Sequence, residues 1–408
     1  MSNLLVSLIS DQTIPNFLFI KTFTKSTDDE YLFLTTNKME NEEKNKRKWI
    51  LESANIAESK QFKITVDAEN KLNVTEKLSK FDFSIYKKIL VNLTGGTKMM
   101  SIAAYEFFKE NQKSELWYLP IGKNTYHICD FPKKQRAIKY KMSVEEYLNC
   151  CGIFKSKNQY TQKEPLKSKD FVENHFNKIG WSPSVDISDK IERLRLFFRS
   201  DNASTRITNK LRNDNLRLDH KLYVNEIKEF NDKEKDERYH FDNFDWVGEL
   251  FKSLHFKLGE YLLKRDIDFI TGGWFEEYVY YIVKQLISNH KNCLKLGIGL
   301  NPNSKNQENA ARYFTNNDLD VVFVHNNELY VVECKSGGMD ANDLYNKTVY
   351  LASALKKYFG LSVKSVLCTL SEMGSNKKEK SEILGVIPID RENFNLKGRF
   401  KEILNLSI

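Results

Sequence analysis

Up to about residue 145, short apolar runs alternate with segments of helical pattern. Runs of the length of buried strands lie at 4–9, 31–34, 62–66 and 89–93. Charged and apolar residues at helical spacing separate them, at 41–58 and 97–109. This alternation is typical of a parallel α/β sheet, because each parallel strand needs a crossover that returns the chain to the same edge. Two further runs, at 114–120 and 125–131, are expected to complete the sheet as an antiparallel edge hairpin.

The rest of the chain divides into two parts. From 146 to 269, Pro and Gly are scarce and charge is dense, which predicts a mostly helical connector, with a small winged element as an option. Its arginines are mixed with many acids, so a solvated helical face is favoured over a dedicated nucleic-acid surface. From 270 to 408 the pattern is again α/β, with helices at 272–287 and 342–359. Strands are expected there at 294–300, 320–324, 329–333 and 363–370.

Composition excludes several classes of protein. With 41% hydrophobic and 29% charged residues, the chain is not largely disordered. No apolar run approaches the ~18 residues that span a bilayer, and the N-terminus lacks the features of a secretory signal. Six cysteines without a CxxC pair form neither a disulfide framework nor a zinc site, so we expect a cytoplasmic protein. The net charge of +8 permits a nucleic-acid partner without requiring one.

At 91–99 a strand runs into a glycine pair and then into a helix. Gly95 and Gly96 allow the backbone to approach a ligand closely, and the helix N-terminus presents N–H groups at a positive dipole end. The turn adds hydroxyl donors and a cation, from Thr94, Thr97 and Lys98. A second loop, at 10–16, should lie beside it at the carboxyl ends of the parallel strands. Neither the dinucleotide nor the ATP-binding glycine spacing is present, and an ordinary tight turn remains an alternative.

Near the C-terminal end, two apolar strands flank Asn326 and Asn327. Asparagine accepts positive φ, so these two residues can form a two-residue hairpin turn in which His325 pairs with Glu328. That register fixes every other pair along both strands, and side chains alternate between the two faces of the hairpin. The positions of the polar side chains on each face are therefore predicted from the turn alone.

This register places Asp320 directly opposite Glu333, with Lys335 on the same face. Two carboxylates at paired positions lie ~5 Å apart and repel unless a cation lies between them. The pattern therefore predicts a divalent-metal site of hard oxygen ligands, with Lys335 able to orient water or neutralise charge on a transition state. Solvated acids with Lys335 as their salt-bridge partner are the alternative. The apolar neighbours on both strands favour the metal site, because buried carboxylates need compensation.

The first loop, followed by the segment NLTGGTKMMSIAAY, resembles the CARF domains of type III CRISPR effectors over about residues 1–145. The resemblance implies a Rossmann-like homodimer whose two loops per subunit enclose a cyclic oligoadenylate across the two-fold axis. The ligand-binding positions implied by it are Ser10, Asp11, Gln12, Thr13, Thr94, Gly95, Gly96, Thr97 and Lys98.

At the other end, the spacing Asp-x12-Glu-x-Lys resembles the core of the PD-(D/E)XK nucleases, which have a restriction-endonuclease-like α/β fold. Asp320, Glu333 and Lys335 are the matching positions, and Leu319 stands where the family usually has proline. The resemblance implies a metal-dependent phosphodiesterase with Asp320 and Glu333 as metal ligands.

Two further residues follow from this resemblance only. The segment 272–279 resembles the opening helix of CARF-fused nucleases, which implies Glu276 as an additional catalytic acid with Glu277 as the second choice. The main-chain carbonyl of Cys334 is implied as a third metal ligand. Both glutamates could instead be ordinary exposed acids of a helix.

Together these features predict a homodimer with a CARF domain at 1–145, a connector at 146–269 and a nuclease domain at 270–408. Cyclic tetra-adenylate is the expected activator, with cyclic hexa-adenylate as an option. The expected activity is Mn²⁺- or Mg²⁺-dependent cleavage of single-stranded DNA or RNA, or nicking of supercoiled DNA, in antiviral defence. Three alternatives remain: a ligand-gated nucleic-acid-binding regulator without cleavage, a ring nuclease that degrades its own activator, and a stand-alone endonuclease. The acid pair argues against the first, the loops supply no obvious base for the second, and the third leaves 94–98 unexplained.

Overall fold

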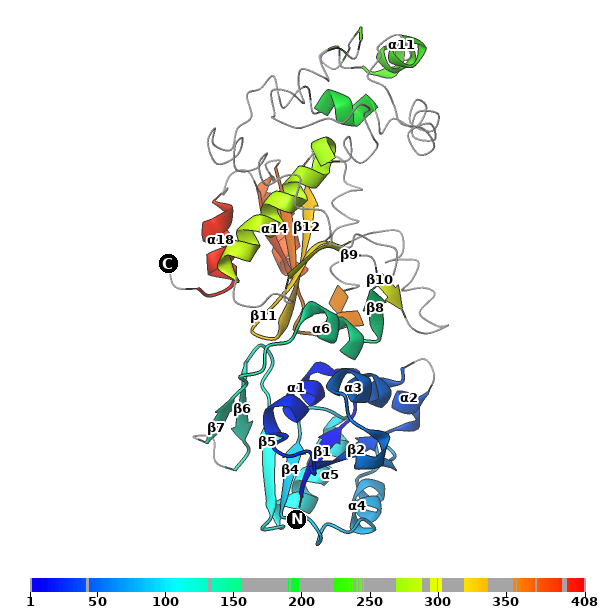
Figure 1. The fold of residues 1–408 in the computed structure, drawn as a ribbon, viewed down its shortest axis with the longest axis vertical. Coiled ribbons are helices and arrows are strands. Elements are labelled where there is room, and N and C mark those ends of the chain that lie inside the picture. The colour runs from blue at the N-terminus through cyan, green and yellow to red at the C-terminus, as the bar shows by residue number, and fades with distance from the viewer. Residues whose placement is uncertain are drawn as a thin grey trace.

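The computed structural model describes eight long segments and several short ones. The long segments are 2–41, 44–130, 134–155, 269–287, 319–336, 358–370, 373–390 and 395–406, and shorter pieces lie within 190–197, 224–245, 294–302 and 355–356. Two α/β units lie one above the other along the long axis, with α6 (Val144–Cys150) between their sheets (Figure 1). The α/β organisation predicted for both ends is confirmed. Most of the expected connector, including any winged element, lies outside the described residues.

The N-terminal sheet has seven strands in the order β3-β2-β1-β4-β5-β6-β7. The first five are parallel: β1 (Asn3–Leu8), β2 (Glu30–Thr35), β3 (Gln61–Thr65), β4 (Lys88–Asn92) and β5 (Ser114–Tyr118). The expected antiparallel hairpin of β5 with β6 (Thr125–Ile128) is present, and β7 (Gln135–Ala137) extends it by a strand that we did not predict. From β1 the chain adds β2 and β3 on one side, and then returns to add β4 and β5 on the other side. Open α/β sheets bind ligands at such a reversal point, which lies here between β1 and β4.

Proline and asparagine residues mark the ends of two helices in this unit. They are α1 (Ile14–Phe23), α2 (Asn37–Glu40), α3 (Lys46–Ala54), η1 (Glu58–Lys60), α4 (Lys71–Ser79) and α5 (Lys98–Lys109). The helix expected at 41–58 is shorter, because Asn45 and Asn55 adopt left-handed conformations at its two ends. The first loop ends at Thr13, since Pro15 lies in the first turn of α1, a position that suits proline.

The C-terminal sheet has five strands in the order β14-β13-β12-β11-β9. They are β9 (Leu294–Ile298), β11 (Leu319–His325), β12 (Glu328–Lys335), β13 (Lys364–Thr369) and β14 (Val386–Ile389). β11 is antiparallel to both neighbours, whereas β12, β13 and β14 are mutually parallel. A π-helical turn, η5 (Phe269–Gly273), leads into α14 (Trp274–Leu286), and the unit also contains α17 (Ser375–Ile383) and α18 (Leu396–Ile403). β8 (Ile153–Lys155) pairs with β10 (Leu300–Pro302) in a separate two-stranded sheet.

Each face of the β11–β12 hairpin lies in a different apolar core. On one face, Phe323 and Tyr330 stack in parallel with ring centroids 4.7 Å apart, in a cluster that includes α14 and α18. On the other face, Val322 and Leu329 join a cluster that includes Tyr147 of α6 and side chains of α1 and α3. Burial of each such side chain stabilises the fold by about 1.5–3 kcal/mol. The two units therefore share a continuous core through α6.

Among the helices in the described segments, none is long and apolar enough to cross a lipid bilayer.

Candidate functional site

The β11–β12 turn has the geometry predicted from its two asparagines. Asn326 and Asn327 have φ values of 50° and 62°, and His325 pairs with Glu328. Asn327 is buried, and its side chain contacts the N-terminal unit through three hydrogen bonds. The partners are the Met142 N–H at 2.9 Å, Asn124 Oδ1 at 2.8 Å and the Tyr140 carbonyl at 2.9 Å. The turn thus sets the strand register and joins the two units.

The far end of the hairpin brings three predicted site residues together. The Cys334 N–H donates to Oδ2 of Asp320 at 2.7 Å, which holds this carboxylate against the neighbouring strand. The Lys335 ammonium contacts Oε1 of Glu333 on the same strand. Asp320, Glu333 and Lys335 are therefore grouped at one end of the sheet, as the register requires.

Negative charge exceeds positive charge in this group. Burial raises the pKa of Asp320 well above its ordinary value, and the charges of Glu333 and Glu276 raise it further. Burial acts to lower the pKa of Lys335, but the charges of Glu333 and Asp320 outweigh that effect and the pKa is raised. A cation in addition to Lys335 would stabilise the ionised form of Asp320.

Glu276 reaches this group from the first turn of α14. The Ser336 hydroxyl at the end of β12 donates to the Thr271 carbonyl of η5 at 2.9 Å, so the start of α14 is fixed beside the strand end. Of the two glutamates weighed from the sequence, Glu276 is the one whose charge acts on Asp320. Glu277 follows it in the same helical turn.

The donor set fits a hard divalent cation that keeps much of its water. Within the described segments, no group of three or more His, Cys, Asp or Glu side chains is arranged to hold a metal ion. Mg²⁺ is commonly held by one or two carboxylates plus water and substrate phosphate, which a pair such as Asp320 and Glu333 can supply. The Cys334 thiol is not suited to binding, because burial raises its pKa well above the ordinary value.

In the N-terminal unit, a buried pair of asparagines links the two loops at the reversal point. Asn92 Nδ2 donates to Asn16 Oδ1 at 2.8 Å, and Asn16 Nδ2 donates to the Leu8 carbonyl at 2.9 Å. Asn92 Oδ1 in turn accepts the Thr94 N–H at 3.1 Å. The loops after β1 and β4 therefore lie side by side, as predicted. We did not identify either asparagine from the sequence, although Asn92 interrupts an apolar strand.

The glycine turn is tightly constrained. A Cβ at Gly95 would lie 2.0 Å from the Leu8 carbonyl oxygen, and Gly96 has a φ of 78°. The Thr97 hydroxyl donates to the Ala68 carbonyl at 2.6 Å and caps α5, and the Thr94 hydroxyl accepts the Leu119 N–H at 2.8 Å. Both threonines thus shape the turn, whereas Lys98 is exposed at the start of α5.

Residues of the first loop form hydrogen bonds and an ion pair within the loop and with other segments of the chain. Ser10 Oγ accepts the Gln12 N–H at 3.2 Å, and the exposed Asp11 forms an ion pair with Lys44 at 2.6 Å. Thr13 is buried, and its hydroxyl donates to the Cys150 carbonyl at 2.6 Å. These contacts fix the loop while leaving the Asp11 side chain at the surface.

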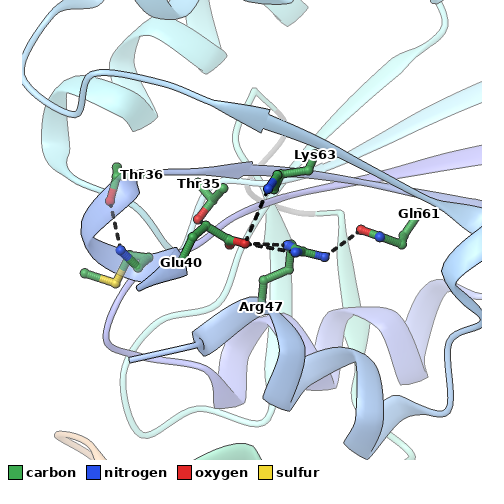
Figure 2. A network of polar contacts seen from close by, with 7 residues as sticks. Thr35, Thr36, Glu40, Arg47, Gln61 and Lys63 are labelled. Carbon is green, nitrogen blue, oxygen red and sulfur yellow. Dashed lines mark hydrogen bonds and ion pairs between the residues drawn. The ribbon is translucent and has the colours of Figure 1, made fainter. Parts of the chain in front are cut away.

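A second polar network holds α2 and α3 against the sheet beside these loops. Figure 2 shows Glu40 at its centre, accepting from Arg47 at 2.9 and 3.0 Å and from the Thr35 hydroxyl at 2.9 Å. Arg47 also donates to Gln61 at 2.9 Å, and Lys63 lies 4.0 Å from Glu40. The network anchors the segment that carries Lys44 toward Asp11. In the sequence, this segment was recognised only as part of the charged helical stretch at 41–58.

Two family models match the chain. The Card1 CARF domain matches residues 4–147, and the Card1-like endonuclease domain matches residues 264–404. Together they cover more than two thirds of the chain, one at each end. The chain belongs to the CARF-domain nuclease effectors. The resemblance inferred from the sequence is thereby confirmed, and the C-terminal unit of this effector is an endonuclease domain.

Two solved structures share the effector's fold over nearly the entire chain. Can2 from Sulfobacillus thermosulfidooxidans, in complex with cyclic tetra-adenylate, superposes with a TM-score of 0.69 over 99% of both chains at 18% identity. Protein VC1899 from Vibrio cholerae gives a TM-score of 0.69 over 99% of this chain and 98% of its own, at 15% identity. No curated protein sequence matches the effector.

Proposed function

We propose that this effector is a homodimer that binds a cyclic oligoadenylate, most simply cyclic tetra-adenylate, and then cleaves nucleic acid with a divalent metal ion in type III CRISPR defence. The sensor would lie within 1–145, the connector within 146–269 and the nuclease within 270–408. The observation that carries the proposal is the convergence of Asp320, Glu333 and Lys335 at one end of the β11–β12 hairpin. Can2, which shares the fold, was solved with cyclic tetra-adenylate, and this supports the choice of activator.

In the proposed mechanism, Asp320, Glu333 and the Cys334 carbonyl would hold Mn²⁺ or Mg²⁺. Such an ion, when bound, lowers the pKa of water and stabilises the departing oxygen. The Cys334 N–H holds the Asp320 carboxylate against the strand that carries Glu333. Lys335, held protonated by the two acids, supplies a cation that neutralises charge developing on the scissile phosphate. Glu276, in the first turn of α14, adds negative charge that acts on Asp320.

In the sensor, the two loops at the reversal point would contact the ring. The exposed Lys98 offers a cation for phosphate, and the N-terminus of α5 presents its positive dipole end. The proposed lining consists of Ser10, Asp11, Thr13 and 94–97, with Thr94 and Thr97 acting through the shape of the turn. A two-fold ligand suits a C2 dimer in which each subunit supplies the same loops.

The test is a gel assay of supercoiled plasmid and of labelled single-stranded DNA and RNA with Mn²⁺. Each substrate is incubated without activator, with cyclic tetra-adenylate and with cyclic hexa-adenylate. Cleavage that requires one of the rings is expected. Cleavage without a ring would favour a stand-alone endonuclease, and ring binding without cleavage of any substrate would favour a regulator.

A further inference from the structure

The first CARF loop contacts the nuclease domain directly. Oε1 of Gln12 accepts a hydrogen bond from the Leu361 N–H at 3.2 Å, and Leu361 lies in the turn that precedes β13. The Gln12 N–H donates to Ser10 Oγ in its own loop. A side chain expected to line the activator site is therefore engaged with the other domain.

The turn that receives Gln12 is shaped around it. Gly360 has a φ of 95°, a conformation that favours glycine, and a Cβ at this position would lie 2.6 Å from Oε1 of Gln12. A side chain at 360 would displace the glutamine. The backbone conformation therefore favours glycine here, and a Cβ would in addition force the Gln12 side chain to move.

Helix α6 also contacts this turn. The Tyr147 hydroxyl donates to the Phe359 carbonyl at 3.1 Å and lies 3.4 Å from Ser362 Oγ. Thr13, next to Gln12, donates to Cys150 at the end of α6. The loop therefore contacts both the turn and the helix that supports the turn.

The turn leads directly to the strand beside the proposed catalytic residues. β13 begins at Lys364 and runs parallel to β12, with Leu367 opposite Glu333 and Thr369 opposite Lys335. The Leu370 N–H donates to the Lys335 carbonyl at 3.0 Å. The turn at 359–362 is thus connected through one strand to the backbone that carries Lys335.

We infer that Gln12 couples the activator loop to the nuclease domain and does not itself contact the activator. The inference rests on the proposed function, in which the neighbouring loop residues bind the ring. A contact couples two sites only if its free energy differs between the resting and activated states. The Gln12–Leu361 bond joins the loop to the nuclease domain, so movement of the loop on ring binding changes it.

The test compares Gln12→Met, which removes the acceptor and keeps the side-chain length, with wild type. Gln135→Met is the control, because Gln135 is an exposed glutamine on β7 of the same domain. Calorimetry gives the Kd for cyclic tetra-adenylate, and the gel assay gives the ratio of cleavage with saturating ring to cleavage without it. Thermal unfolding verifies that each variant is folded.

We expect Gln12→Met to bind the ring with an unchanged or tighter Kd, while the cleavage ratio falls by about fivefold, the typical effect of one hydrogen bond. Gln135→Met should match wild type in both measurements. A Kd weakened by more than about threefold would make Gln12 a ring contact, and an unchanged ratio would remove its coupling role; either overturns the inference. If wild type itself shows no ring-dependent cleavage, the proposed function fails, whatever the variant does.

A double-mutant cycle with Gly360→Ala provides a second measurement. If both residues act through one contact, Gly360→Ala should lower the cleavage ratio in wild type and have little further effect in Gln12→Met. Fully additive effects on the ratio would contradict a shared contact. The Gln12→Met comparison stands by itself if Gly360→Ala is too strained to fold.

Discussion

Oδ2 of Asp320 accepts the main-chain N–H of Cys334 at 2.7 Å, across the two strands of the β11–β12 hairpin. The position of this carboxylate is therefore set by the backbone of the strand that carries Glu333 and Lys335. Every residue except proline would supply this N–H at position 334. The placement of the acid pair therefore depends on strand register more than on the Cys334 side chain.

Asp320→Asn is expected to reduce nuclease activity at least about hundredfold while leaving ring binding unchanged, because the amide retains an acceptor for Cys334 but loses the charge that binds metal. Cleavage rates and the Kd for the ring measure the two effects separately. Glu379→Gln, an exposed acid on α17, is the control and should retain wild-type rates. Metal-dependent cleavage by Asp320→Asn at the wild-type rate would refute the site assignment.

Lys335→Met should abolish most cleavage and leave metal binding intact or tighter. The ammonium contacts Glu333, so it competes with a divalent ion for that carboxylate. Titration calorimetry with Mn²⁺ measures the affinity, and the gel assay measures cleavage. A large loss of Mn²⁺ affinity in this variant would mean that Lys335 supports the metal site instead of acting on the substrate.

The raised pKa of Asp320 predicts how stability depends on pH in the metal-free effector. The native state holds a proton on Asp320 that the unfolded state releases near pH ~3.9, so this stabilisation is present at low pH and is lost as pH rises through the raised pKa. The Tm of wild type relative to Asp320→Asn should therefore fall as the pH of an EDTA buffer is raised from below the ordinary aspartate pKa of ~3.9. Calorimetric unfolding of both proteins tests this, and a difference that is constant or increases with pH would contradict it.

Lys98→Ala should raise the concentration of cyclic tetra-adenylate needed for half-maximal cleavage by about tenfold, because a charge-assisted contact to phosphate is lost. Activity without ring should not change. Lys109→Ala, at the other end of the same helix, is the matched control. A dose–response curve identical to that of wild type would move the activator site away from the start of α5.

Local signals were sufficient to predict the parallel sheet and the hairpin register. Buried parallel strands give continuous apolar runs, so β4 was identified as a strand. An Asn-Asn pair permits a two-residue turn, so β11 and β12 were identified together with their pairing. The meeting of Asp320, Glu333 and Lys335 then followed from alternation. The shorter α3 was missed because helical periodicity alone does not reveal the left-handed caps at Asn45 and Asn55.

Contacts between distant segments were not predictable in this way. Asn16 and Asn92 are far apart in the sequence, and nothing in the pattern around either one indicates the hydrogen bond between them. The same holds for Gln12 and Leu361, which are joined only because the two units share a core. Periodicity assigns a residue to an element and a face, whereas these pairs depend on how whole units dock.

The shared core described above also limits how such effectors can recombine. Val322 and Leu329 on one face of the nuclease hairpin are covered by side chains that belong to α6 and to the sensor. A chimera that joins the sensor of one homologue to the nuclease of another would leave these residues against a surface that did not evolve with them. Exchange of sensor specificity should therefore succeed by replacing the ring-facing loops within one chain, and fail when whole domains are swapped.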